Sequence, residues 1–205
     1  MASRLRPYES GTLVLVAAEG AYIGHIQISD TLKEGAGDAV GKLKNSGYHT
    51  AMLTGDGAET AEAVAAQLGL DSVYAQLLPH EKLEKLQAIR RKNGAVMFVG
   101  DGINDAPVLA GADVGCAMGS GADAAIEAAD VVFMTSDASA IPESLEIAKK
   151  TLAVAWQNVV FALAIKAAVM LLGLFGFASM WLAVFADSGV AMLCVLNSIR
   201  MLYKK

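Results

Sequence analysis

Two apolar segments in the second half of the chain constrain its fold more than any other feature. They lie at residues 154–176 and 180–200, and overlap the runs "VVFALAIKAAVMLLGLFGFA" (159–178) and "MWLAVFADSGVAMLCVLNSIRML" (180–202). Each holds about 20 residues, the length of helix that crosses a bilayer core of about 30 Å. Because no charged residue lies in the short connection between them, the sequence predicts a transmembrane helical hairpin.

Basic residues flank this hairpin at both of its outer ends. A helical pattern over residues 139–153 leads into the first segment and predicts a cytosolic stalk helix. Positive charge next to membrane segments marks the cytosolic side, so we expect both termini and the preceding soluble region in the cytosol. The flanking charges are Lys149, Lys150, Arg200, Lys204 and Lys205.

The remaining composition excludes several classes of protein. The net charge is −5 and the basic residues are scattered, which gives no electrostatic support for nucleic-acid binding. The two cysteines, Cys116 and Cys194, form no CxxC pair, so neither a disulfide framework nor a thiolate metal site is indicated.

Short apolar runs alternate with helical patterns between residues 21 and 138, which predicts an α/β domain with an open, mostly parallel, Rossmann-type sheet. Residues 1–20 do not fit this alternation and are interpreted as a remnant of another domain. We expect helices near 34–46, 57–68, 80–92, 104–111 and 120–129. Strands are expected at 12–18, 24–29, 49–54, 72–77, 95–100, 114–118 and 131–135.

The stretch "VGDGINDAPVL" places Asp101 and Asp105 directly after a predicted buried strand. Ligands of open parallel sheets bind beyond the carboxyl ends of the strands. Carboxylates combined with glycines, which allow close approach of the backbone, suit Mg²⁺ and phosphate. The structural alternative is that both acids only cap the helix that follows.

Two further connections point to phosphate chemistry. In "LTGDG", Thr54 offers a hydroxyl group at a strand end, and the next helix offers its first backbone amides. Lys82 lies early in the helix of "LLPHEKLEKL" and could supply positive charge. Considered in isolation, it would be interpreted as an ordinary solvent-exposed lysine on a helix. Threonine, lysine and paired aspartates on separate strand-to-helix connections are typical of phosphoryl transfer.

"TGD" followed by "GDGINDAPVL" resembles the phosphorylation domain of P-type ATPases, within the haloacid dehalogenase superfamily. The resemblance implies that Thr54 binds the phosphoryl group, Asp56 shapes its pocket and Lys82 neutralises charge there. It also implies that Asp101 and Asp105 form the Mg²⁺ site. Asn104 would orient this cluster together with Asp105.

The sequence departs from the family most clearly at the nucleophile. The family's nucleophilic aspartate lies in a DKTGT motif, and these 205 residues contain no such motif. The actuator loop and most of the nucleotide-binding domain are also absent, and residues 1–20 resemble the final strands of that domain. We therefore expect a haloacid dehalogenase-like sheet that lacks its nucleophile strand. Taken alone, the chain should form no aspartyl-phosphate, and ATP would act through parts outside it.

The two membrane segments each contain one charged residue. Lys166 lies 11 residues before Phe177 and Asp187 lies 10 residues after it, so both fall about 15 Å from the turn. Charged groups at this depth are costly and are candidates for function, and the two could form a pair. The structural alternative is an ion pair that only joins the two helices.

The sequences around these charges, "AIKAA" and "ADSGV", resemble the last two helices of zinc, cadmium and lead P-type ATPases. That resemblance implies that Asp187 is a ligand of the transported metal and that Lys166 is a built-in counter-ion. The leading hypothesis is the C-terminal portion of a Zn²⁺, Cd²⁺ or Pb²⁺ exporter in a bacterial plasma membrane. If the pump is naturally split, a separate N-terminal half is a further expected partner.

Two other hypotheses remain at this stage. A membrane-tethered phosphatase of the haloacid dehalogenase type would need a nucleophile before Thr54, and Asp30 is the one candidate, without a second acid two residues later. A non-enzymatic subunit would instead bind a separate N-terminal half and complete its sheet.

Overall fold

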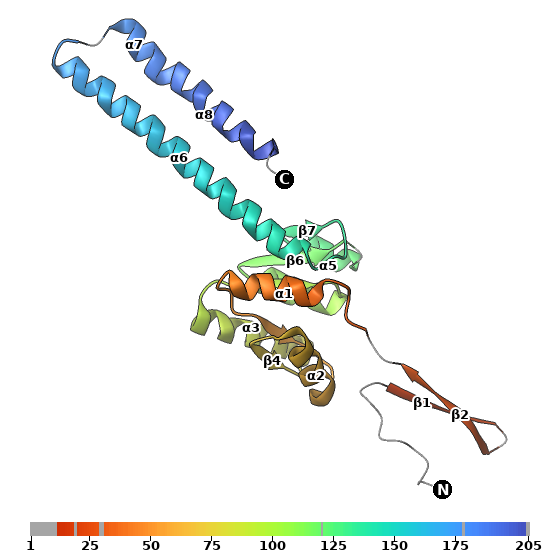
Figure 1. Cartoon of the computed structure of the whole chain (residues 1–205). Coiled ribbons are helices and arrows are strands. Elements are labelled where there is room, and N and C mark those ends of the chain that lie inside the picture. The colour runs from red at the N-terminus through yellow and green to blue at the C-terminus, as the bar shows by residue number, and fades with distance from the viewer. Residues whose placement is uncertain (1–11, 19, 29–30, 120, 178, 204–205) are drawn as a thin grey trace. The chain divides into compact units, whose positions relative to one another are not determined.

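The computed structural model describes residues 12–18, 20–28, 31–119, 121–177 and 179–203 (Figure 1). The chain divides into two compact units, residues 1–142 and residues 143–205. The first contains all of the strands among the described residues, and the second is helical. Asp30, the candidate nucleophile of the phosphatase hypothesis, lies outside the described residues.

An antiparallel hairpin forms the first part of the α/β unit. Strands β1 (Thr12–Ala18) and β2 (Ala21–Ile28) pair with Leu15 opposite His25, and Gly20 adopts a positive φ of 77° in the turn. A positive φ is readily adopted by glycine, which explains the tight connection. The boundary expected between residues 20 and 21 falls inside this hairpin, because β2 pairs with β1 rather than with the parallel strands.

The alternation of strands and helices predicted after the hairpin is present, with elements slightly shorter than expected. The helices are α1 (Ala36–Asn45), α2 (Ala58–Leu68), α3 (Pro79–Asn93), α4 (Ala106–Gly111) and α5 (Asp123–Ala128), with one 3₁₀ turn, η1 (Ile103–Asp105). The strands are β3 (Ala51–Leu53), β4 (Ser72–Tyr74), β5 (Met97–Gly100), β6 (Val114–Met118) and β7 (Val131–Phe133).

These strands form two parallel sheets. β3 pairs with β4, while β5, β6 and β7 form a separate sheet in that order. Within the described part of the chain, β3 and β5 each pair with one strand only, so each sheet has an open edge there. A sheet that lacks one strand, as expected from the sequence, would leave open edges of this kind.

The helix ends follow from local sequence. Gly47, Gly69 and Gly94 follow α1, α2 and α3 with φ angles of 84°, 70° and 96°, a conformation that residues with a Cβ rarely adopt. Pro79 begins α3, where its missing N–H leaves no hydrogen bond unmade.

The core of the α/β unit lies around β6 and α4. Val108, Leu109, Cys116 and Ala117 are completely buried. Burial raises the pKa of the Cys116 thiol to about 11, with the nearby Asp130 carboxylate adding to the effect. Cys116, Met118 and Phe133 form a cluster, and Met97, Val99, Ala140 and Ile141 pack against it.

The second unit contains the predicted hairpin. Helix α6 (Ala140–Leu174) runs without interruption through the expected stalk and first span. The return segment consists of α7 (Met180–Val184), a π-helical turn η2 (Phe185–Gly189), α8 (Val190–Ile199) and a final 3₁₀ turn η3 (Arg200–Tyr203). Residues 140–174 and 180–202 are both long and apolar enough to cross a membrane.

Candidate functional site

The acidic loop "GDGIND" begins where β5 ends. Asp105 lies in η1, and its backbone N–H donates to the Gly102 carbonyl over 3.0 Å, which closes a tight turn. A Cβ at Gly100 would lie 2.9 Å from the Asp105 Cβ. Glycine at position 100 therefore lets the Asp105 side chain fold back over the end of the strand.

Lys82 reaches this loop from α3. Its Nζ donates to Asp105 Oδ1 over 2.8 Å, and the two side chains are only 16% and 15% exposed. The sequence did not distinguish Lys82 from Lys85, but the structure does, because Lys85 Nζ lies 4.4 Å from the centre of the Tyr74 ring. The structure thus brings a positive charge and an acid together at the carboxyl end of β5.

Asp101 and Asn104, the other predicted residues of the loop, are exposed. The Asp101 side chain makes no hydrogen bond within the described residues, whereas its backbone oxygen accepts from Ala122 N–H over 2.9 Å. A Cβ at Gly121 would lie 2.9 Å from the Asp101 oxygen and 2.8 Å from the Met118 oxygen. The connection from β6 to α5 therefore supports the backbone of Asp101, and sequence reasoning overlooked this role although the glycines signalled a close approach.

Thr54 and Asp56 form a second local pair after β3. Thr54 Oγ1 donates to Asp56 Oδ2 over 2.6 Å, and Asp56 N–H donates to Thr54 Oγ1 over 3.1 Å. Backbone bonds from Leu77 N–H to the Thr54 oxygen and from Gln76 N–H to the Asp56 oxygen fix the turn against the loop after β4. Among the described residues, no hydrogen bond or ion pair joins this pair to Lys82 and Asp105.

The acidic loop suits a magnesium ion. Mg²⁺ is usually held by one or two carboxylates together with water and phosphate oxygens. Asp101 offers a carboxylate that has no partner among the residues the structure describes, while Asp105 is already paired with Lys82. The described residues contain no group of three or more histidine, cysteine or acidic side chains that could hold a metal without such additional oxygen ligands.

The predicted pair in the membrane hairpin is present. Lys166 Nζ donates to Asp187 Oδ1 over 3.0 Å, from α6 to the π-helical turn η2. π-Helical turns are rare and occur often at functional sites. The side chains of Lys166 and Asp187 are 52% and 76% exposed, so the pair is open to a further ligand or helix.

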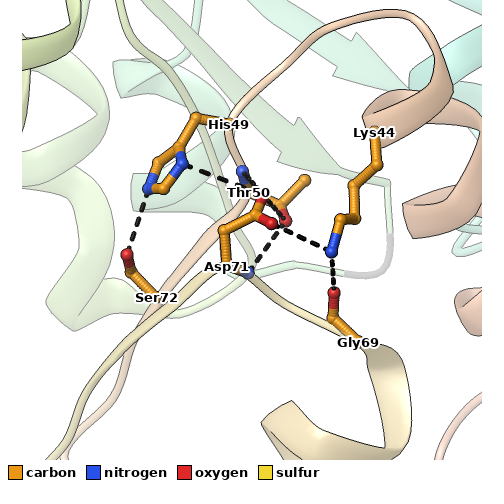
Figure 2. Close-up of polar contacts among 6 residues, drawn as sticks. All are labelled: Lys44, His49, Thr50, Gly69, Asp71 and Ser72. Atoms are coloured by element: carbon orange, nitrogen blue, oxygen red, sulfur yellow. Dashed lines mark hydrogen bonds and ion pairs between the residues drawn. The ribbon is translucent and has the colours of Figure 1, made fainter.

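A different polar cluster lies at the opposite, amino ends of β3 and β4 (Figure 2). Asp71 accepts from Lys44 Nζ over 2.9 Å and from the backbone and hydroxyl of Thr50 over 2.9 and 2.8 Å. His49 contacts Ser72 Oγ over 3.0 Å, but its Nδ1 lies 3.8 Å from Asp71. Because the Asp71 carboxylate is occupied by Lys44 and Thr50, this cluster ties elements together and does not form a Ser–His–Asp triad.

The α/β unit and its acidic loop define a class of protein. The haloacid dehalogenase-like hydrolase family model matches residues 3–113, more than half of the chain, and the chain belongs to this family. The resemblance stated from "TGD" and "GDGINDAPVL" is thereby confirmed at the level of the fold.

More specific similarity covers nearly the whole chain. It is 51% identical to the cadmium, zinc and cobalt-transporting ATPase of Bacillus subtilis, over 96% of this chain and 29% of that protein. It is 50% identical to the zinc-transporting ATPase of Synechocystis, over 93% of this chain and 27% of that protein. A crystal structure of a zinc-transporting PIB-type ATPase in the E2.Pi state superposes with a TM-score of 0.86 at 37% identity, covering 94% of this chain and 32% of that one.

The chain therefore matches the C-terminal part of heavy-metal P-type ATPases, which hydrolyse ATP and translocate metal ions. It spans less than a third of the length of each of these relatives. The comparisons favour the pump hypothesis over the two alternatives formed from the sequence.

Proposed function

We propose that this chain supplies the C-terminal part of an ATP-driven exporter of a divalent heavy-metal cation, with Zn²⁺, Cd²⁺ and Pb²⁺ as expected substrates. The observation that carries the proposal is the Lys166–Asp187 pair, with 3.0 Å between Nζ and Oδ1, in two helices of membrane-spanning length. A phosphatase tethered to a membrane needs no charge inside its anchor, whereas ionisable residues inside membrane segments mark ion pathways.

At this pair, Asp187 is the proposed ligand of the transported cation and Lys166 its counter-ion. While Lys166 holds the carboxylate, the cation has to compete with an ammonium group of this same chain. Lys166 therefore favours release of the metal, and Asp187 returns to its partner once the metal has left.

In the α/β unit, Thr54 is proposed to bind the transferred phosphoryl group and Asp56 to hold the Thr54 hydroxyl in place, in keeping with their 2.6 Å hydrogen bond. Lys82 would offset negative charge there, and its ion pair would hold the Asp105 carboxylate in place. Mg²⁺ would be held by Asp101 and Asp105, with Asn104 orienting the loop, and would supply charge neutralisation at the phosphate. ATP is proposed to reach this site through parts of the pump outside these residues.

The phosphorylated aspartate is also proposed to lie outside these residues, because they contain no DKTGT motif. The open edges of β3 and β5 support this, since a strand between them would pair with both sheets. Residues 1–20 are proposed to belong to the nucleotide-binding domain, residues 21–138 to the phosphorylation domain, and residues 139–153 to the stalk before spans 154–176 and 180–200. We also propose a bacterial plasma membrane, with both termini in the cytosol.

A chimeric pump tests the proposal. Residues 1–205 replace the corresponding C-terminal segment of the Bacillus subtilis relative, which is 51% identical over this region. We expect the chimera to restore growth of an exporter-deficient strain on zinc or cadmium, and Asp187→Asn to abolish that growth. Asp38→Asn, an exposed carboxylate on α1, is the matched control and should grow like the unmodified chimera. Export at an unchanged rate by Asp187→Asn would refute the assignment.

The purified 205-residue chain provides the complementary test. Incubated with Mg²⁺ and γ-³²P-labelled ATP, it should acquire no acid-stable phosphate, while the chimera should be labelled. Covalent labelling of the isolated chain would show that a nucleophile lies within it and would favour the phosphatase hypothesis.

A further inference from the structure

The hairpin contains a second set of polar contacts besides the Lys166–Asp187 pair. The Asn158 cluster consists of Asn158 on α6 and Cys194, Asn197 and Ser198 on α8. Asn158 Nδ2 donates to the Cys194 carbonyl over 3.2 Å and to Ser198 Oγ over 2.9 Å, and Asn158 Oδ1 accepts from Asn197 Nδ2 over 2.8 Å. One side chain on α6 therefore engages three residues of α8.

The cluster is specific for one alignment of the two helices. Cys194, Asn197 and Ser198 are spaced by three and four residues, so they share one face of α8. Both donor hydrogens of the Asn158 amide are used, and its oxygen also has a partner. Sliding α8 by one turn would break all three bonds, and in hydrocarbon the released groups would find no water to replace them.

Further polar contacts lie within the cluster and beside it. Ser198 Oγ donates to the Cys194 carbonyl over 3.0 Å, and the Cys194 thiol lies 3.7 Å from the Asn158 carbonyl. Next to it, Arg200 donates to Gln157 Oε1 over 2.6 Å. These contacts all lie on the side of the hairpin away from its connecting turn.

The Lys166–Asp187 pair lies eight residues further along α6 than Asn158, which is about 12 Å along the helix. On the return segment the π-helical turn at Phe185–Gly189 shifts the rotation of the helix at Asp187. Gly189 is needed inside this turn, because a Cβ there would lie 2.7 Å from the Phe185 ring. The direction of Asp187 therefore depends on two things: the π-helical turn and the register in which α8 is held.

We propose that Asn158 is a positioning residue: it fixes the register of α8 on α6 so that Asp187 meets Lys166. The assignment rests on the proposed function in treating that meeting point as the cation site. Asn158 is not one of the proposed cation ligands, and the hydrogen bonds of its side chain among the described residues all go to α8. Its contribution is geometric, through the helix that carries the carboxylate.

Disulfide cross-linking of the 205-residue chain in lipid nanodiscs measures this register. In a background with Cys116→Ala and Cys194→Ala, Lys166→Cys is combined in turn with Asp187→Cys, Ala183→Cys and Ala191→Cys. The last two positions lie about one turn to either side of Asp187. Cys194 enters the cluster mainly through its backbone oxygen, which the alanine keeps.

With Asn158 intact we expect the 166/187 pair to cross-link fastest. Asn158→Leu, which keeps the size and removes the amide, should lower the rate of 166/187 relative to the two offset pairs about tenfold, equivalent to 1.4 kcal/mol. Asn158→Gln keeps an amide and should restore part of this preference. Trp156 and Trp181, the two tryptophans of the sequence, both lie in the hairpin, so their fluorescence reports that it has formed.

An unchanged ratio in Asn158→Leu would overturn the proposal. An equal fall in all three rates would also overturn it, because Asn158 would then only hold the helices together without setting their register. If Asn158→Leu fails to insert, Asn197→Leu and Ser198→Ala remove its partners on α8 and should shift the same ratio. Since no metal, ATP or pump is involved, this result stands or falls independently of the growth test of the chimera.

Discussion

The two units of this chain are held together in opposite ways. In the α/β unit, completely buried apolar side chains such as Val108 and Leu109 form the interior, and the polar groups gather at the strand ends. Among the described residues of the helical hairpin, only Val154, Ala186 and Val190 are buried, and polar contacts join the helices at two levels. In water, the burial of apolar side chains drives folding. Lipid is itself as apolar as leucine, so membrane helices associate through close packing of small residues and through hydrogen bonds.

The largest effect that separates the units should come from Leu109→Ala. Leu109 is completely buried in α4, so the substitution should lower the free energy of unfolding of the α/β unit by about 2–5 kcal/mol. Hydrogen exchange measured peptide by peptide should show this loss around β5, β6 and α4, with the hairpin unchanged. Met134→Ala, at a side chain that is 88% exposed, should change exchange little. Equal losses in both units would mean that their stabilities are not separate.

Lys82→Ala should have the next largest effect, on chemistry rather than on folding. Removing one preorganised hydrogen-bond donor from a site that stabilises developing negative charge lowers the rate about 10²–10³-fold. We expect a loss of this size in the ATP hydrolysis rate of the chimeric pump, because the Asp105 carboxylate would be left without its 2.8 Å partner. Lys85→Ala, on the same helix but over the Tyr74 ring, is the matched control. Similar losses of ATP hydrolysis in both variants would show that Lys82 has no role that Lys85 lacks.

Ser198→Ala should have a smaller effect, confined to the hairpin. It removes the acceptor of the 2.9 Å bond from Asn158, and single hydrogen bonds between membrane helices contribute about 0.6 kcal/mol on average. The fluorescence of Trp156 and Trp181 during titration with sodium dodecyl sulfate should report the shift. A loss of several kcal/mol would indicate that the cluster acts as one cooperative unit.

The smallest effect is expected for Asp71→Asn, which should depend on pH. The Thr50 backbone N–H, then Lys44 and the Thr50 hydroxyl, lower the pKa of the Asp71 carboxyl well below its ordinary value of 3.8 (Figure 2). A carboxyl with a lowered pKa stabilises the fold above its unfolded-state pKa, and this contribution is lost as pH falls towards the folded-state value. The Tm difference between the two proteins should therefore be constant near pH 7 and shrink below about pH 4. A difference independent of pH would exclude the charged pair as its cause.

Much of the fold could be predicted because its signals are local. Helix-terminal glycines such as Gly69, the proline at position 79, and the lengths of the apolar segments each act over a few residues. The pairing of Lys166 with Asp187 followed from counting residues along two helices of known rise. The antiparallel pairing of β2 was harder, because a single apolar run does not reveal which strand it will join.

The site was predicted less completely, for a physical reason. Acidic residues, lysine and threonine have side-chain chemistry that can be recognised in a sequence. The residues of the acidic loop, and the lysine and threonine expected near it, could therefore be named in advance. The supporting contacts are made by backbone atoms, such as the bond from Ala122 N–H to the Asp101 oxygen, and any residue type can make them. The Asn158 cluster was missed for a related cause. The partners of an asparagine or serine in an apolar helix can be assigned only when the facing helix and its alignment are known.

The close approach at Gly121 has a consequence for how this loop tolerates change. Since a methyl group there would press on the backbone oxygens of Met118 and Asp101, the placement of the exposed acid depends on a position that has no chemistry of its own. A saturation survey of the chimeric pump would then find Gly121 among its least replaceable positions, although glycine has no reactive group. Variants that change the acids of this loop should therefore keep this glycine.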